Sequence, residues 1–178
     1  SIAWDYMKQF TAKIPHTKFN ETELRVDLPN GSRITLLGSE SPDGLRGIYL
    51  DGCVIDEYAN VNSKLFPEII RPALSDRKGY CVFIGTPMGM NNNFYELYQH
   101  AQGAEDWFNY KAKASDTKIV DNDELVKAKE VMGEKKYLQE FECDWIANIE
   151  GSVYGDVIAK LDDDKQLSRV PYDPSLPV

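Results

Sequence analysis

The sequence predicts an α/β fold built on parallel strands, and two apolar runs separated by a helical stretch carry that prediction. Residues 48–55 are mostly apolar apart from Asp51, and residues 79–85 are rich in aromatic and branched side chains. Runs of this kind are typical of buried strands in a parallel sheet. Between them, residues 62–74 place apolar side chains at helical spacing. A strand, a helix and a second parallel strand form a right-handed crossover.

Helical spacing also occurs on both sides of this crossover. Residues 93–104 place Phe94, Leu97 and Tyr98 on one helix face. Residues 2–14 carry an apolar side chain at every fourth position, at Ile2, Tyr6, Phe10 and Ile14. Within the crossover helix, Pro72 is expected to kink or end the helix.

A β-hairpin is predicted between the first helix and the crossover. Residues 23–28 and 33–37 largely alternate polar and apolar side chains around Pro29-Asn30-Gly31-Ser32. Alternation around such a turn sequence is typical of two antiparallel strands.

After the crossover, the chain is predicted to form a further strand at residues 108–114 and a loop at residues 115–117. Helices are predicted at residues 121–132 and 134–141, the first of which opens with acidic residues that suit a helix N-terminus.

We expect residues 1–150 to form one domain and residues 151–178 to form a linker. The stretch 171–177 contains three prolines in seven residues and has no apolar face. Such a composition favours an extended connection.

Composition and charge limit the possible functions. The net charge of -9 argues against a chain that coats DNA by itself, so any DNA contact should be local or supplied by another part of the protein. Three cysteines, Cys53, Cys81 and Cys143, lack paired spacing, which predicts buried thiols and neither a disulfide framework nor a zinc site. We expect a cytosolic protein without a membrane partner, because no apolar run is long enough to span a bilayer and no signal peptide is evident.

The strongest candidate site begins where the first apolar run ends, at Asp56 and Glu57. Adjacent carboxylates at the C-terminal edge of a parallel sheet lie where α/β folds bind ligands. In P-loop ATPases the first acid holds Mg²⁺, usually through water, and the second orients and deprotonates the attacking water. This pattern assigns Mg²⁺ to Asp56 and the catalytic base to Glu57. The alternative is that two acids simply begin the loop after a strand.

Thr86 ends the second apolar run, one helix after the acids. This is the layout of a sensor strand, whose small polar side chain lies beside Mg²⁺ and the γ-phosphate and responds to hydrolysis. The alternative is a strand-ending turn made by Gly85, Thr86 and Pro87. Taken together, the two strand ends favour a nucleotide-driven motor.

Ordered segments along the chain match the pattern of one family. They are Gly44-Leu45-Arg46-Gly47, Val54-Ile55-Asp56-Glu57-Tyr58-Ala59, Ile84-Gly85-Thr86-Pro87-Met88-Gly89, Phe94-Tyr95-Glu96-Leu97, the stretch 137–143 and the stretch 151–155. They resemble the large terminase subunit of tailed bacteriophages and prophages. The resemblance implies a three-layer, parallel-sheet P-loop ATPase core of the ASCE type. It also implies coupling to DNA translocation and a metal-dependent nuclease downstream.

The resemblance also implies ligands and partners. ATP and Mg²⁺ would be the cofactors, with Asp56 and Thr86 at the nucleotide. Double-stranded DNA, a portal protein and a small terminase subunit would be the partners of a homo-oligomeric ring in the cytoplasm of the bacterial host. The hairpin would be an insertion, and the C-terminal helices would close the ATPase domain.

Arg46 stands between two glycines before the acidic strand. It resembles the arginine finger that this family inserts into a neighbouring subunit's site, where it stabilises charge on the transferring phosphoryl group. The alternative is a solvated arginine or a salt bridge to Asp43 or Asp51. Arg71 and Arg77 are the other candidates.

Two departures limit these expectations. No Gly-Lys pair occurs in the chain, so the phosphate-binding loop is expected upstream of Ser1 and the chain alone is expected to be inactive. The run Asp162-Asp163-Asp164 is expected to be solvated and not a metal site.

The competing interpretations are a helicase-type P-loop ATPase fragment and a non-catalytic prophage remnant or interaction module. The tryptophans, Trp4, Trp107 and Trp145, are expected to be core or interface residues.

Overall fold

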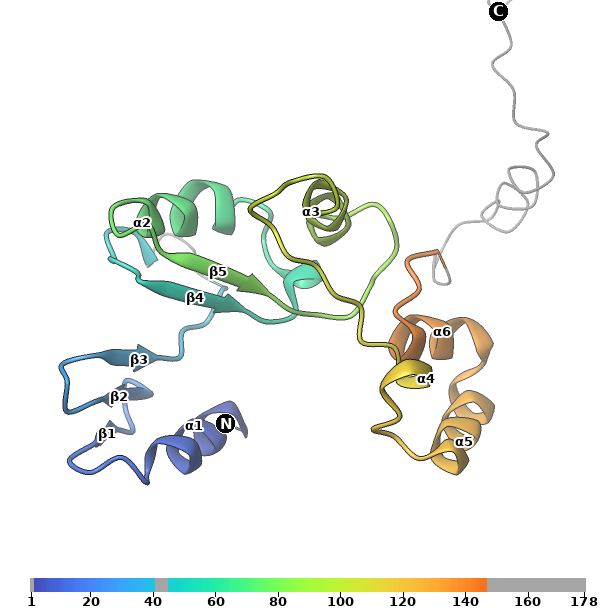
Figure 1. Cartoon of the computed structure of the whole chain (residues 1–178), viewed down its shortest axis with the longest axis horizontal. Coiled ribbons are helices and arrows are strands. Elements are labelled where there is room, and N and C mark those ends of the chain that lie inside the picture. The colour runs from blue at the N-terminus through green and yellow to red at the C-terminus, as the bar shows by residue number, and fades with distance from the viewer. Residues whose placement is uncertain (1, 41–44, 147–178) are drawn as a thin grey trace, which may run out of the picture. The chain divides into compact units, whose positions relative to one another are not determined.

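The computed structural model describes residues 2–40 and 45–146 (Figure 1). These residues belong to two compact units. Unit 1 contains the described residues up to 53 and residues 61–82, and unit 2 contains residues 54–60 and 83–146. The predicted linker at 151–178 lies outside the described residues. In the described part of the chain, none of the helices combines the length and the apolar character that a membrane span requires.

Unit 1 begins with a helix and a three-stranded antiparallel sheet. The elements are α1 (Ile2–Thr11), β1 (Lys18–Asn20), β2 (Arg25–Asp27) and β3 (Arg33–Thr35), and the strand order is β1-β2-β3. Val26 in the central strand pairs with Phe19 and Ile34 and is fully buried. The predicted hairpin is confirmed as β2 and β3, and β1 extends it into a sheet.

α1 buries a different face from the one that its apolar spacing indicates. Ile2, Tyr6 and Phe10 are 78%, 55% and 74% exposed, whereas Trp4 is 3% exposed. The Trp4 indole N–H donates a hydrogen bond to the Glu21 carboxylate at 2.6 Å. The spacing therefore predicts the helix correctly, while the tryptophan determines which side is buried.

The predicted crossover is present. β4 spans Gly52–Ile55 and β5 spans Tyr80–Phe83. The Tyr80 amide donates to the Asp51 carbonyl at 3.3 Å, and the Ile84 amide donates to the Ile55 carbonyl at 3.0 Å. Because both bonds have the same offset between the strands, β4 and β5 are parallel, as their arrows show in Figure 1. The predicted α/β class with a parallel sheet is confirmed.

The connection between β4 and β5 is a π-helix, η3 (Leu65–Ile70), that continues as α2 (Arg71–Ser75). Pro72 lies in the first turn of α2, where its missing N–H leaves no unsatisfied donor. The Arg71 amide bonds to the Phe66 carbonyl five residues back, which is π-type bonding. The helix therefore does not end at Pro72, where a kink or an end is expected. It changes from π-type to α-type just before this proline. The helix buries the predicted apolar residues Leu65, Ile69, Ile70 and Leu74.

The two parallel strands are less buried than their apolar sequences predict. Val54, Tyr80 and Val82 are 61%, 67% and 43% exposed. Within the described residues the sheet has only these two strands, so each strand pairs along one edge. The prediction of fully buried strands is wrong for this part of the chain, because that burial needs further elements around the sheet.

The cysteines are half-buried, which corrects the prediction of buried thiols. The thiols of Cys53 on β4 and Cys81 on β5 influence each other, which lowers the pKa of Cys53 and raises the pKa of Cys81. Burial is the main cause of the raised pKa of Cys143.

Unit 2 is mainly helical. Its elements are η2 (Tyr58–Asn60), α3 (Asn93–Ala101), α4 (Ala114–Thr117), α5 (Asn122–Met132) and α6 (Glu134–Glu142). Asn92 caps α3 by accepting from two backbone amides, and Asp121 caps α5 by accepting from one. The predicted helices at residues 93–104, 121–132 and 134–141 are confirmed, with ends shifted by up to three residues.

The strand predicted at residues 108–114 is wrong. No strand forms there, and Phe108 and Tyr110 are 87% and 71% exposed. The alternating pattern suits an extended chain, but a strand also needs a partner, and the described residues supply none. The loop predicted at residues 115–117 is also wrong, because these residues belong to α4.

Candidate functional site

The ends of β4 and β5 bring three predicted site residues together in unit 2. The Ile84 amide donates to the Ile55 carbonyl at 3.0 Å, and the Tyr58 amide donates to the Ile84 carbonyl at 3.1 Å. The chain that leaves β4 therefore runs beside the chain that leaves β5. Both acids lie on the first of these segments and the threonine lies on the second. We name Asp56, Glu57 and Thr86 the strand-end edge.

Gly85 lies at a close approach between these two segments. A Cβ atom at Gly85 would lie 3.2 Å from the Tyr58 amide nitrogen and 3.4 Å from the Glu57 Cα. Because a side chain would crowd both atoms, glycine lets the backbone before Thr86 pass directly beside Glu57.

The backbone determines where the two acids lie. The exposed Asp56 carboxylate accepts a hydrogen bond from the Glu57 amide at 2.9 Å. Glu57 has a φ of 51°, in the left-handed region, which costs a non-glycine residue about 1–2 kcal/mol. Tyr58 anchors the turn: it is 3% exposed, and its ring centroid lies 4.7 Å from Phe83 and 5.9 Å from Phe94. A strained turn that presents an exposed carboxylate is typical of a functional position.

The strand-end edge offers oxygen ligands of the kind that Mg²⁺ prefers. Its donors are two adjacent carboxylates and one partly buried hydroxyl. Among the described residues, no three or more His, Cys, Asp or Glu side chains converge on one point as a complete metal cage. An edge with few protein ligands suits Mg²⁺, which usually keeps several waters and binds substrate phosphates.

Arg46 belongs to unit 1, where its guanidinium lies 3.9 Å from the Glu68 carboxylate. The two side chains are 56% and 50% exposed, and they line a pocket of about 320 Å³. Asp51, one of the partners considered for Arg46, is instead paired with Arg77 at 2.9 Å. An exposed ion pair contributes at most about 1 kcal/mol, so the contact with Glu68 by itself adds little stability.

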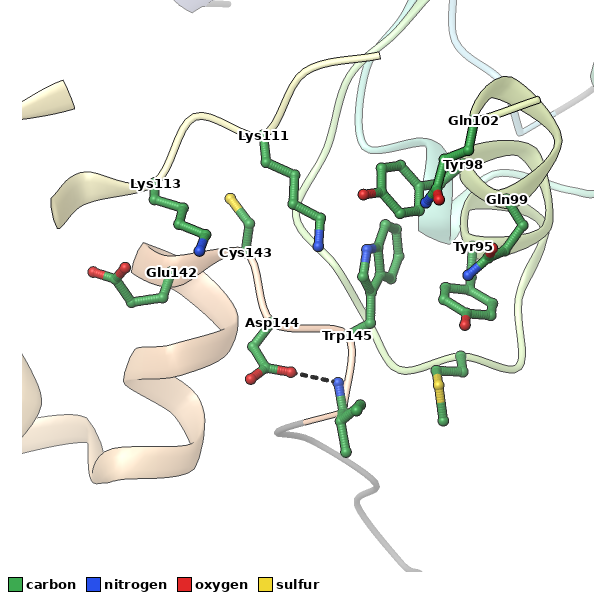
Figure 2. A pocket seen from close by; sticks show the side chains of 12 residues that line it. Tyr95, Tyr98, Gln99, Gln102, Lys111, Lys113, Glu142, Cys143, Asp144 and Trp145 are labelled. Carbon is green, nitrogen blue, oxygen red and sulfur yellow. Dashed lines mark hydrogen bonds between the residues drawn. The ribbon is translucent and has the colours of Figure 1, made fainter. Parts of the chain in front are cut away.

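Unit 2 also contains a pocket that the sequence motifs did not predict. Its volume is about 350 Å³, and its lining comes from α3, the segment before α4 and the end of α6 (Figure 2). The Trp145 ring forms one wall, with its centroid 5.2 Å from Tyr95 and 5.4 Å from Tyr98. We name this the Trp145 pocket, after its lining by Tyr95, Tyr98, Lys111, Lys113 and Trp145. Since three separate segments form it, no local spacing in the sequence could have indicated it.

Solved structures share this fold. The large terminase ATPase domain of Thermus phage P74-26 matches with a TM-score of 0.62 at 22% identity, over 79% of this chain and 68% of that chain. A large terminase from a thermophilic bacteriophage, solved in complex with ADP, matches with a TM-score of 0.63 at 14% identity, over 79% of this chain and 36% of that chain. At these identities the matches establish the fold alone.

Sequence comparison establishes the relationship. The large terminase subunit of Thermus virus P23-45 is 42% identical to this chain over 60 residues, or 34% of the chain. The chain is a relative of phage large terminase subunits. The resemblance predicted from its motifs is thereby confirmed, although no protein-family model matches the sequence. The matched stretch spans only 12% of the curated terminase, so it supports the relationship and not the activity of the whole protein.

Proposed function

We propose that this sequence belongs to the ATP-hydrolysing motor of a terminase large subunit, which moves double-stranded DNA into a procapsid. One observation carries the proposal, namely the two carboxylates and one hydroxyl on adjoining segments where β4 and β5 end. The terminase relationship and the ATPase-domain fold agree with it. The ADP bound to one structural relative supports a nucleotide as the ligand.

In this proposal each group of the strand-end edge has a separate task. Asp56 would hold Mg²⁺ through water, and the ion would supply positive charge opposite the phosphates. Glu57 orients the attacking water and accepts its proton. The Thr86 hydroxyl hydrogen-bonds near the γ-phosphate and changes partner after hydrolysis, which passes the state of the nucleotide to its loop.

Arg46 acts as an arginine finger in this proposal. In a homo-oligomeric ring it would leave Glu68 and stabilise the γ-phosphate in a neighbouring subunit's site. The 3.9 Å separation and half-exposed side chains of the Arg46–Glu68 pair support this role, because such a pair is weak.

The proposed motor works in the cytoplasm of a bacterial host with a portal protein, a small terminase subunit and double-stranded DNA. We also propose that residues 151–178 lead toward a nuclease domain. Because this sequence has a net charge of -9, we propose that its own DNA contacts are local or that the contacts are supplied by other parts of the protein.

The test is ATP hydrolysis by the complete protein that contains this sequence, with double-stranded DNA and Mg²⁺. Glu57→Gln keeps the size of the side chain and removes the base. We expect it to lower the hydrolysis rate at least about 100-fold and to leave ATP binding within about twofold. The matched control is Glu96→Gln on the exposed side of α3, which should hydrolyse ATP at the parent rate.

Two results would contradict this assignment. Loss of ATP binding together with hydrolysis in Glu57→Gln would make Glu57 structural. A complete, folded protein with no DNA-stimulated hydrolysis would favour a non-catalytic interaction module.

A further inference from the structure

Trp145 carries a buried hydrogen-bond donor that has no acceptor among residues 2–40 and 45–146. The residue is 7% exposed, and its Nε1 is buried without a hydrogen-bond partner. An unpaired buried N–H costs about 1–3 kcal/mol, and such groups are rare in folded proteins. A ligand that brings an acceptor oxygen would recover this free energy.

Two lysines line the same pocket as this donor. The Lys111 ammonium is 5.0 Å from the centroid of the Tyr98 ring, which also packs against Trp145. Lys111 and Lys113 both act to lower the pKa of Cys143, although burial raises that pKa overall, so both charges lie close to the same thiol. Among the described residues, neither lysine has an ion-pair partner.

The acids of the same pocket already have donors. The Glu142 carboxylate accepts from the Ser115 hydroxyl at 2.6 Å and from the Tyr137 hydroxyl at 3.4 Å. The Asp144 carboxylate accepts from the Ile146 amide at 2.6 Å and is turned toward it in Figure 2. Each carboxylate therefore already accepts at least one hydrogen bond, whereas within the described residues the two ammonium groups have no ion-pair partner and the indole N–H has no acceptor.

We propose that the Trp145 pocket binds a phosphate group, with Lys111, Lys113 and the Trp145 indole N–H as its donors. A phosphate presents several acceptor oxygens and a negative charge, which matches two cations and a neutral N–H. The side-chain amides of Gln99 and Gln102 line the same pocket. The aromatic faces pack against one another, so base stacking has no part in the proposal. The choice of the DNA backbone or a nucleotide as the source of this phosphate rests on the proposed motor function.

The test is a titration of the 178-residue chain followed through its indole N–H resonances by ¹H–¹⁵N NMR. The three tryptophans give three such resonances, and Trp145→Phe identifies the one from the pocket. Inorganic phosphate is added against sodium chloride at matched ionic strength. We expect a saturable shift of the Trp145 resonance with phosphate and none with chloride.

Lys111→Gln should weaken this binding at least tenfold, because it removes a charged donor and keeps most of the side-chain length. Lys127→Gln is the matched control, since Lys127 is an exposed lysine on α5 and should leave the titration unchanged. Unaltered Trp4 and Trp107 resonances in each variant show that the fold is intact.

Double-stranded DNA and ATP, added separately, distinguish the sources. A shift or broadening of the Trp145 resonance with DNA assigns the pocket to the backbone phosphodiester, and a shift with ATP alone assigns it to a nucleotide phosphate. The proposal is overturned if phosphate produces no shift, if chloride acts equally, or if Lys111→Gln titrates as the parent does. Phosphate binding in this pocket does not require ATP hydrolysis, so the two experiments test the two proposals separately. If phosphate does not bind, the Glu57→Gln result still tests the motor. If ATP is not hydrolysed, the phosphate titration still tests the pocket.

Discussion

Two buried tryptophans, one in each unit, differ in a single hydrogen bond. Trp4 is 3% exposed and its indole N–H donates to Glu21 at 2.6 Å, whereas Trp145 is 7% exposed and its N–H has no partner in the part of the chain that the structure describes. Both rings pack against aromatic neighbours. The comparison teaches that ring burial alone does not indicate function. The paired indole completes a contact within unit 1, while the unpaired one leaves room for an acceptor from outside the described chain.

The sharpest test of this difference is to remove each indole nitrogen by substitution with phenylalanine. Trp4→Phe should lower the free energy of unfolding by about 2 kcal/mol, because a packed ring shrinks and a hydrogen bond is lost. Trp145→Phe should cost less than about 1 kcal/mol, because removing an unpaired N–H offsets much of the lost packing. Urea unfolding of both variants measures this. Equal losses would mean that the Trp145 N–H is satisfied in solution.

A second test asks whether the Trp145 pocket and the strand-end edge depend on the packing of the same side chain, Phe94. A Cβ atom at Gly85 would lie 3.3 Å from the Phe94 ring, and Phe94 packs against Trp145 with ring centroids 5.4 Å apart. We expect Gly85→Ala to destabilise the chain by about 1 kcal/mol through overpacking and to shift the Trp145 indole resonance.

Gly103→Ala is the control for that substitution. A Cβ atom there would meet nothing within 4 Å, so the variant should match or slightly exceed the stability of the parent. If Gly103→Ala were the more harmful change, the close approach at Gly85 would not explain the effect.

The smallest expected effect is a difference in acid sensitivity. The indole N–H of Trp4, and then Lys8, lower the pKa of Glu21 below its usual value of 4.5. The stabilisation from this contact is therefore fully present above about pH 4.5 and is lost as the pH falls through the lowered pKa. The Trp4 indole resonance should move in that range, because its acceptor gains a proton. Glu21→Gln should abolish the Trp4 response, and its persistence would assign the response to another acid.

Local patterns in the sequence predict which segments form helices and strands better than they predict what those segments pack against. The spacing of Leu65, Ile69, Ile70 and Leu74 predicts both a helix and its buried face, because this segment packs within unit 1. The spacing in α1 predicts the helix and not the buried face. The alternation at residues 108–114 predicts an extended chain, but strand formation depends on a partner that local sequence does not specify.

Some features of the candidate site can also be predicted from the sequence, and others cannot. The proximity of Asp56, Glu57 and Thr86 follows from the sequence, because parallel strands joined by one crossover end at the same edge. The left-handed backbone at Glu57 and the pairing of Arg46 with Glu68 do not follow from it. Trp145 was predicted only to be a core or interface residue, because its missing acceptor becomes evident only after the chain is folded.

The left-handed conformation of Glu57 has a consequence for protein engineering. Glycine adopts that conformation without steric penalty, so Glu57→Gly would relax the turn by about 1 kcal/mol while it deletes the proposed base. A screen that rewards thermostability alone would therefore select against catalysis at this position. Retaining glutamate at this position therefore keeps the stability of the chain slightly below what glycine would allow.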